Sequence, residues 1–280
     1  MDKKSAENDT FLKQFSGFLK TPPLWLNTET FQFPQLLLKE KELSETFPEP
    51  NIFSNLVLGK RIERFFRIYL QYFSEEEEVL AENVQIFADK ITLGELDFIL
   101  KNKNSGKVSH IEVVYKFYIY DPSFENELER WIGPNRRDSL IKKIIRLETR
   151  QFPLLFQKEA QPLLRELQIE PENIDQKVLF KANLFVPCEI LDQHFPGINN
   201  ECVQGFWIKA SEFNEAAFGK YRFFSPTKPD WPVLPENNTT WHSFSEIRVQ
   251  VDGFLKKERS PLLWMKKNDR IYTRFFIVWW

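Results

Sequence analysis

Two carboxylates and a lysine stand at alternating positions of two neighbouring segments that read as strands. In LGELDFIL, every second residue from Gly94 to Leu100 is small or apolar, and Asp97 stands on the opposite face. In HIEVVYKFYIY, Glu112 and Lys116 share the other face. If the two segments pair, these three side chains converge on one side of the sheet. Carboxylates suit Mg²⁺ and a lysine can orient or deprotonate water, so the pattern predicts a metal-dependent hydrolytic site.

A simpler interpretation is an amphipathic hairpin whose charged face meets water and forms cross-strand ion pairs, worth about 0.2–1 kcal/mol each. Against it, Val114, Tyr118 and Tyr120 share the face of Glu112 and Lys116, which is apolar for a solvated surface. Two charges on such a face are costly unless they are paired or bind a ligand.

A third acid stands in the helix predicted over residues 55–73. Glu63 lies three residues before Phe66 and seven before Leu70, on a face that must also pack. It is a candidate fourth member of the site, and the alternative is a glutamate at the helix border that reaches solvent.

The elements around these residues follow from hydrophobic periodicity. The middle of the chain reads as helix, three strands, helix and strand, which describes an α/β unit of one sheet covered by helices. An acidic connector is expected at 74–83, and residues 36–47 are expected to be helical. The predicted strands and helices of the middle region, and the three strands predicted after it, are 55–73, 83–88, 93–100, 110–120, 136–152, 177–187, 204–208, 245–252 and 271–280.

The string GELDFIL and this order of elements resemble the PD-(D/E)xK phosphodiesterase superfamily, with Glu112 matching its second-strand acid. The resemblance implies a restriction-endonuclease-like core over residues 55–187, a mixed sheet flanked by helices. We expect an N-terminal helical extension over 1–54 and an α+β extension over 188–280 that packs on the core. More narrowly, LGELDFIL, HIEVVYKFYIYDP, WIGPNRRDSL and RQFPLL resemble the bacterial family DUF1853, of unknown function, over most of the chain after residue 55.

The superfamily resemblance implies that Asp97, Glu112 and Glu63 hold Mg²⁺ or Mn²⁺ and that Lys116 acts on the attacking water. One position departs from the pattern. The superfamily lysine stands two residues after the strand acid, where this chain has Val114, and Lys116 lies about 6.6–6.8 Å further along the same face. A long lysine can reach back over that distance, so both an active and an inactive site remain open.

Two further residues are expected to support the site. Glu95 shares a strand face with Asp97, so it is expected to assist the ligands or to contact a helix. Gln151 closes the helix predicted over 136–152, and resemblance to RecB-like members implies that its side chain faces the site.

Phosphate binding must come from a local patch, because Lys+Arg 38 against Asp+Glu 40 leaves a net charge of -2. A solvated helix face is the alternative use for such residues. The basic residues expected to bind DNA or RNA at this patch are Arg136, Arg137, Lys142, Lys143, Arg146 and Arg150.

Composition narrows the remaining classes of protein. The 2 cysteines and 3 histidines have no spacing typical of a zinc site or a disulfide framework, which favours the reducing cytoplasm. No run approaches the roughly 18 apolar residues of a membrane span, so no membrane association is expected.

We therefore expect a magnesium-dependent nuclease, or a non-catalytic module with the same fold that binds nucleic acid or protein. An unrelated α/β protein with a charged hairpin is a third interpretation. The oligomeric state and the choice between DNA and RNA do not follow from the sequence.

Overall fold

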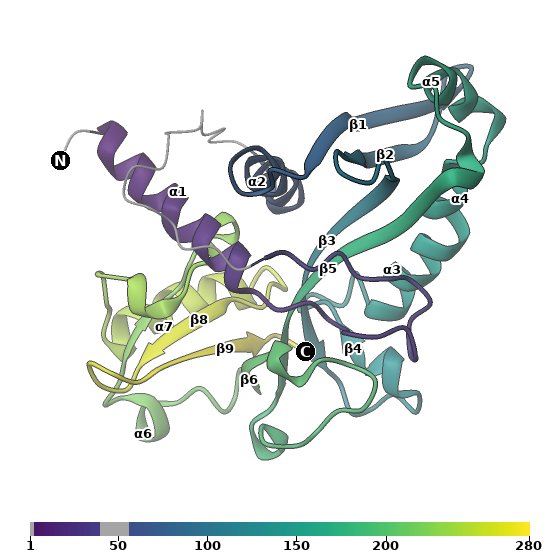
Figure 1. Ribbon diagram of the computed structural model, residues 1–280. Helices are drawn as coiled ribbons and strands as arrows, with labels where there is room; N and C mark the ends of the chain where they lie inside the picture. Colours follow the sequence, from purple (N-terminus) through teal and green to yellow (C-terminus); the bar gives the residue numbers. More distant parts are fainter. Residues whose placement is uncertain (1–2, 40–55) are drawn as a thin grey trace.

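The computed structural model describes residues 3–39 and 56–280, with side chains from residue 9, and is organised around one large sheet (Figure 1). Within these residues the sheet has nine strands in the order β1-β2-β3-β5-β6-β9-β8-β7, and β4 pairs with β3. The strands are β1 Glu77–Ala88, β2 Ile91–Asn102, β3 Val108–Tyr120, β4 Trp131–Ile132, β5 Ile174–Pro187, β6 Val203–Lys209, β7 Arg222–Phe224, β8 Leu262–Lys266 and β9 Tyr272–Val278.

The sheet is mixed. Strands β3, β5, β6 and β9 run parallel in its centre, whereas β1–β2–β3 and β9–β8–β7 are antiparallel ribbons on either side. Every residue of β5 from Val178 to Val186 is buried, as expected for a central parallel strand covered on both faces. The pairing of β5 with β6 carries the sheet without interruption past residue 187.

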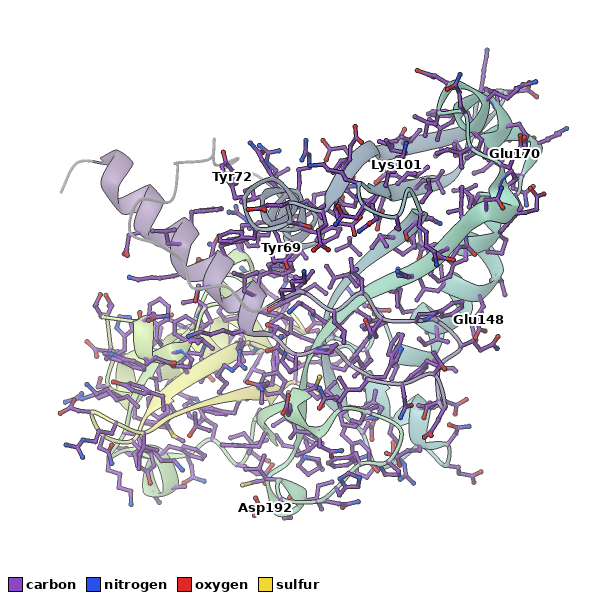
Figure 2. The ribbon with its side chains drawn as sticks, viewed as in Figure 1. Tyr69, Tyr72, Lys101, Glu148, Glu170 and Asp192 are labelled. Carbon is purple, nitrogen blue, oxygen red and sulfur yellow. The ribbon has the colours of Figure 1, made fainter. Side chains whose placement is uncertain are left out.

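The helices cover both faces of the sheet. On one face α1 and α2 pack together, and Phe15 and Phe65 meet edge to face at 5.7 Å. Tyr69 of α2 is buried on this side, whereas Tyr72 is exposed (Figure 2). The α-helices are α1 Lys3–Lys20, α2 Leu58–Phe73, α3 Leu140–Arg146, α4 Phe152–Leu154, α5 Gln161–Glu166, α6 Glu215–Phe218 and α7 Phe244–Leu255.

The opposite face carries α3, α4 and α7. Leu140 and Ile144 of α3 pack with Val114 and Tyr118 of β3, which alternate with the β3 residues that face α2. Helix α7 covers the C-terminal strands in a separate apolar cluster. The predicted mixed sheet flanked by helices is therefore confirmed.

The elements predicted in the middle of the chain are confirmed, with corrections at their ends. Strand β1 begins at Glu77, inside the expected acidic connector. The segment 136–152 is helical from Leu140, but its second half, Leu147–Gln151, is a π-helical turn. The predicted helix over 36–47 is wrong at residues 36–39, which have no regular secondary structure; the Leu36 N–H donates to the Val178 carbonyl of β5. The remainder of the predicted helix lies outside the described residues.

The strand predicted over 245–252 is wrong, because this segment lies in helix α7. Ser243 and Glu246 form a capping box at its start. Phe244, Ile247 and Val251 are buried at helical spacing. The alternation of SEIRVQV resembles a strand, but the cap satisfies the backbone donors that begin a helix.

The alternation predicted along β2 is interrupted at Asp97. Leu96 packs in the cluster that contains Leu154 of α4, whereas Phe98 packs against Phe66 of α2, with ring centroids 4.9 Å apart. The small and apolar residues of β2 therefore do not form one continuous face. Asp97 lies at the point where the strand changes face.

Candidate functional site

The candidate site lies where β2 and β3 separate. Their described pairing runs from Lys101 opposite Val108 to Phe98 opposite Ile111. Beyond it, the Val113 backbone N–H donates to Asp97 Oδ2 at 2.8 Å. A carboxylate thus takes a donor that a regular strand ladder would use, which places a buried acid at the fork between the strands.

Glu112 is fully buried on β3, on the side of α3. Gln151 Nε2 donates to its Oε2, and His110 Nε2 lies 3.1 Å from its Oε1. Gln176 Nε2 approaches His110 Nδ1 at 3.2 Å, so the Nε2 atom carries the proton and donates to Glu112. Burial lowers the pKa of His110 to about 4, which keeps the ring neutral at pH 7.

The helical segment after β4 brings Lys143 and Gln151 to this carboxylate. Lys143 Nζ donates to Gln151 Oε1 at 2.6 Å. Eight residues of regular α-helix would turn the two side chains about 80° apart. The π turn at Leu147–Gln151 takes up one extra residue, so both side chains point to the same place.

A second group of acids lies on the α2 side of Asp97. One carboxylate oxygen each from Glu63, Glu95 and Asp97 lies within 4.8 Å of the others. Lys60 pairs with Glu63 at 2.7 Å and also with Glu95. The side chains of Glu63, Glu95 and Lys60 are 13%, 24% and 42% exposed, so the cluster opens to solvent at Lys60.

The charges of these acids are poorly compensated. Burial, reinforced by Glu112, raises the pKa of Asp97 to about 7. Burial raises the pKa of Glu63 to about 7 despite its bond to Lys60, and with Asp97 adding to it. Burial likewise raises the pKa of Glu112 to about 8, against the opposing effect of Lys143. At neutral pH these carboxyls therefore share protons that a bound cation would displace.

The pKa values of Lys143 and Lys60 are shifted in opposite directions. Burial lowers the pKa of Lys143, and this outweighs the attraction of Glu112 and Asp97. Burial also lowers the pKa of Lys60, but the bonds and charges of Glu63 and Glu95 outweigh it, and the net shift is upward. Lys60 is thus held as a cation by the acids, whereas Lys143 is the more easily discharged of these two lysines.

Lys116 is directed to a different acid. Its Nζ pairs with Asp138, whose carboxylate also accepts the Ser139 backbone N–H at 2.9 Å. Among the described residues this is the single ion pair of Lys116. The lysine that interacts with Glu112 and Asp97 is Lys143, from the helix.

The basic residues predicted to contact nucleic acid divide into two groups. Arg136 pairs with Asp121 at 3.0 Å, and its guanidinium lies 4.4 Å from the Trp280 ring, so its charge is already engaged within the protein. Arg146 interacts electrostatically with Glu112, which places it next to the acids. Besides Arg136, the residues of the predicted patch that are exposed on and near α3 are Arg137, Lys142, Arg146 and Arg150.

The sequence analysis did not single out Lys60 or His110. Lys60 stands three residues before Glu63, the spacing of ion pairs along a helix. His110 stands two residues before Glu112, on the same strand face. Both spacings are readable in the sequence, but neither distinguishes a site from an ordinary surface pair.

The family model described as Domain of unknown function (DUF1853) matches residues 14–278, which confirms the narrower resemblance. No curated protein and no solved structure shows significant similarity to the chain. In the described part of the chain, every helix is too short or too polar to cross a lipid bilayer.

Proposed function

We infer the function of this chain, which belongs to the DUF1853 family, from its site, and we propose that it is a metal-dependent phosphodiesterase acting on nucleic acid. One observation carries the proposal. Four carboxylates, those of Glu63, Glu95, Asp97 and Glu112, gather at the fork between β2 and β3, and the pKa values of three of them are raised.

A divalent cation would compensate the residual negative charge of this group. When all groups are ionised, four carboxylates outnumber the three nearby cations Lys60, Lys143 and Arg146. All the anionic groups are carboxylates, which are the hard ligands of Mg²⁺ and Mn²⁺. The residues present therefore fit such an ion.

Asp97 is the residue common to both groups of acids, so it would hold the ion together with Glu112 or Glu63. A bound ion would offset charge on the phosphoryl group and acidify a water molecule. We assign the lysine role to Lys143, whose depressed pKa suits a group that exchanges a proton with water. Gln151 bridges Lys143 and Glu112 and holds both in place.

The order of elements supports a restriction-endonuclease-like core. Helix α2, strands β1 to β3, helix α3 and strand β5 follow each other as that fold requires, and β3 and β5 pair in parallel. We propose that residues 55–187 form this core, with the acids on α2, β2 and β3.

The substrate proposed is DNA or RNA. Lys142, Arg146 and Arg150 expose three cations on the helical segment that also supplies Lys143 and Gln151. Such residues neutralise backbone phosphates without reading sequence. These three cations would hold a nucleic-acid strand beside the acids.

A non-catalytic binding module is the second candidate, and Lys60 favours it. Its ammonium already pairs with two of the acids, Glu63 and Glu95. A protein side chain in this position supplies part of the compensation that a metal would otherwise provide.

Calorimetric titration with Mg²⁺ and Mn²⁺ separates the two candidates. A nuclease should bind the ion, lose binding in Asp97→Asn, and bind more tightly in Lys60→Met, because a competing cation has been removed. The exposed Glu148→Gln on the π turn is the matched control. The binding module would be established if the protein binds no ion and if it binds labelled DNA or RNA without cleaving it.

A further inference from the structure

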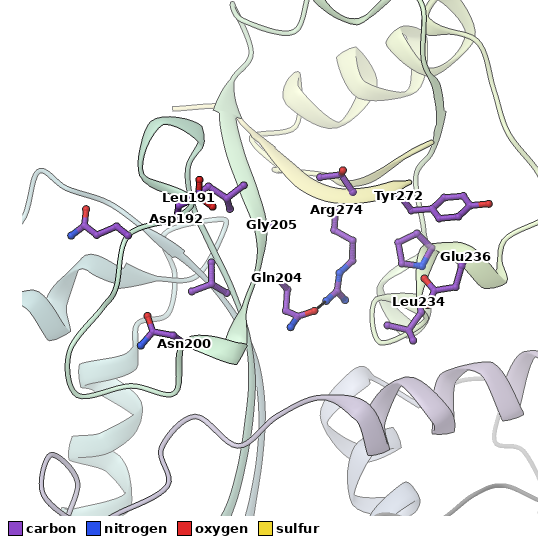
Figure 3. A pocket seen from close by; sticks show the side chains of 13 residues that line it. Leu191, Asp192, Asn200, Gln204, Gly205, Leu234, Glu236, Tyr272 and Arg274 are labelled. Carbon is purple, nitrogen blue, oxygen red and sulfur yellow. Dashed lines mark hydrogen bonds between the residues drawn. The ribbon is translucent and has the colours of Figure 1, made fainter. Parts of the chain in front are cut away.

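A polar cavity lies apart from the acids, at the start of β6 and β9. It encloses about 640 Å³, within the range of small-molecule sites. Gln204 and Arg274 project into it from neighbouring strands, and Leu234 and Glu236 line it from a loop (Figure 3).

Arg274 is the key residue of this cavity because its charge has no paired acid. The side chain is only 5% exposed. Its Nη2 donates to Gln204 Oε1, and within the described chain this is the one hydrogen bond of the guanidinium. No described carboxylate forms an ion pair with it, which leaves most of its five donors available.

A buried guanidinium without a paired acid is costly unless a ligand satisfies its charge and its remaining donors. Burial lowers the pKa of Arg274, against the opposing influence of Tyr115 and Glu236. A buried guanidinium bound to one amide oxygen has a desolvation penalty that a neutral partner offsets poorly. Buried charges in proteins are normally paired.

The guanidinium is also held in a defined orientation. Gln204 Nε2 donates to the Glu201 carbonyl at 2.6 Å, which turns its Oε1 toward Arg274. A planar guanidinium fixed on one side presents its remaining donors as a fork, the geometry that binds carboxylate or phosphate oxygens in pairs.

We propose that this cavity binds a small organic molecule through a single carboxylate or phosphate group seated on Arg274. The charge of the lining limits the ligand. Asp192 and Glu236 also face the cavity and are exposed, so they repel polyanions such as a nucleic-acid backbone. Leu191, Leu234 and Pro235 provide apolar wall for the body of the ligand.

The test uses inorganic phosphate and acetate as probes on the full-length protein. Either probe should raise the Tm at neutral pH relative to chloride at equal ionic strength. The stronger of the two responses tells whether the natural group is a phosphate or a carboxylate. Equal responses to phosphate, acetate and chloride would overturn the proposal.

Two variants locate the response. Arg274→Met removes the buried charge while keeping an unbranched side chain, and it should abolish the Tm shift. An undiminished shift in this variant would place the anion elsewhere and overturn the proposal. If Arg274→Met does not fold, the exposed Glu236→Gln decides: losing a repulsive charge should lower the Kd of the probe several-fold, and an unchanged Kd contradicts the proposal.

Discussion

Asp97 accepts a hydrogen bond of 2.8 Å from the Val113 backbone N–H, across the fork between β2 and β3. The bond takes the place of a strand-to-strand hydrogen bond, so the carboxylate itself occupies the gap where the two strands separate. Glu112 precedes Val113 on β3 and raises the pKa of Asp97. One structural feature therefore accounts for three observations: the two strands separate at Asp97, the Asp97 carboxylate is buried there, and it is coupled to Glu112.

The variants Asp97→Asn and Glu112→Gln should each reduce metal-dependent cleavage of nucleic acid by about 100-fold or more, since even outer partners of metal ligands contribute about 10–100-fold. Both changes remove charge and preserve shape, and the new Asn can still accept from Val113. Cleavage of labelled strands in Mg²⁺ or Mn²⁺ measures the effect, with Glu148→Gln as the control. Activity that survives both substitutions would belong to another site or a contaminant.

The free energy of unfolding without metal should fall as pH rises from about 4 to about 8. Asp97, Glu63 and Glu112 have pKa values raised from 3.8 or 4.5 to about 7, about 7 and about 8. The pKa of His110 is lowered from 6.5 to about 4, which acts in the opposite direction, but the three carboxyl shifts together are larger, so the folded chain binds more protons in this window. The stabilising contribution of the three carboxyls is complete below the unfolded pKa values and disappears above the folded ones. Urea unfolding at several pH values measures it.

A saturating divalent ion should reduce this loss, because it binds the deprotonated carboxylates of the folded state. Asp97→Asn should flatten the metal-free profile, since one of the shifted groups is gone. The Asp97→Asn profile serves as the reference for all other ionisable groups. If the free energy of unfolding of the wild type rises between pH 5 and 8 relative to this reference, the assignment of a buried protonated cluster is contradicted.

Lys143→Met should lower cleavage by about 10²-fold or more, the usual contribution of a positioned proton-transfer group. Lys116→Met should have a much smaller effect, because Lys116 pairs with Asp138. Lys158→Met is the control, because the Lys158 side chain is 90% exposed and is not one of the proposed strand-binding residues. The pH dependence of cleavage should also change only in Lys143→Met; the opposite ranking would return the role to the strand lysine.

Arg146→Gln combined with Arg150→Gln should weaken strand binding and reduce its dependence on salt. For each cation that neutralises a duplex phosphate, the slope of log K against log salt steepens by about 0.9, so removing the cation makes the slope shallower by that amount. Fluorescence anisotropy over a salt series measures the slope. Lys158→Gln, whose side chain is 90% exposed, is the control, and an equal weakening there would indicate non-specific attraction.

Local patterns in the sequence are sufficient to place the elements that carry the acids. Helix α2 follows from apolar residues at helical spacing, and β2 and β3 from alternation bounded by a polar turn, because these patterns depend on neighbours along the chain. The presence of Asp97 and Glu112 on adjacent strands follows in the same way. Helix α7 could also have been predicted from the sequence, since Ser243 and Glu246 have the spacing of a capping box.

The choice of cations that meet the acids depends on three-dimensional packing. Lys143 reaches Glu112 because a π turn aligns it with Gln151 and because α3 packs over β3, whereas Lys116 is drawn to Asp138 at the start of the same helix. The face change at Asp97 depends likewise on packing of Leu96 and Phe98 against different helices. These contacts join segments that are far apart in the chain, and they depend on how side chains fill the core. Local residue spacing therefore does not predict them.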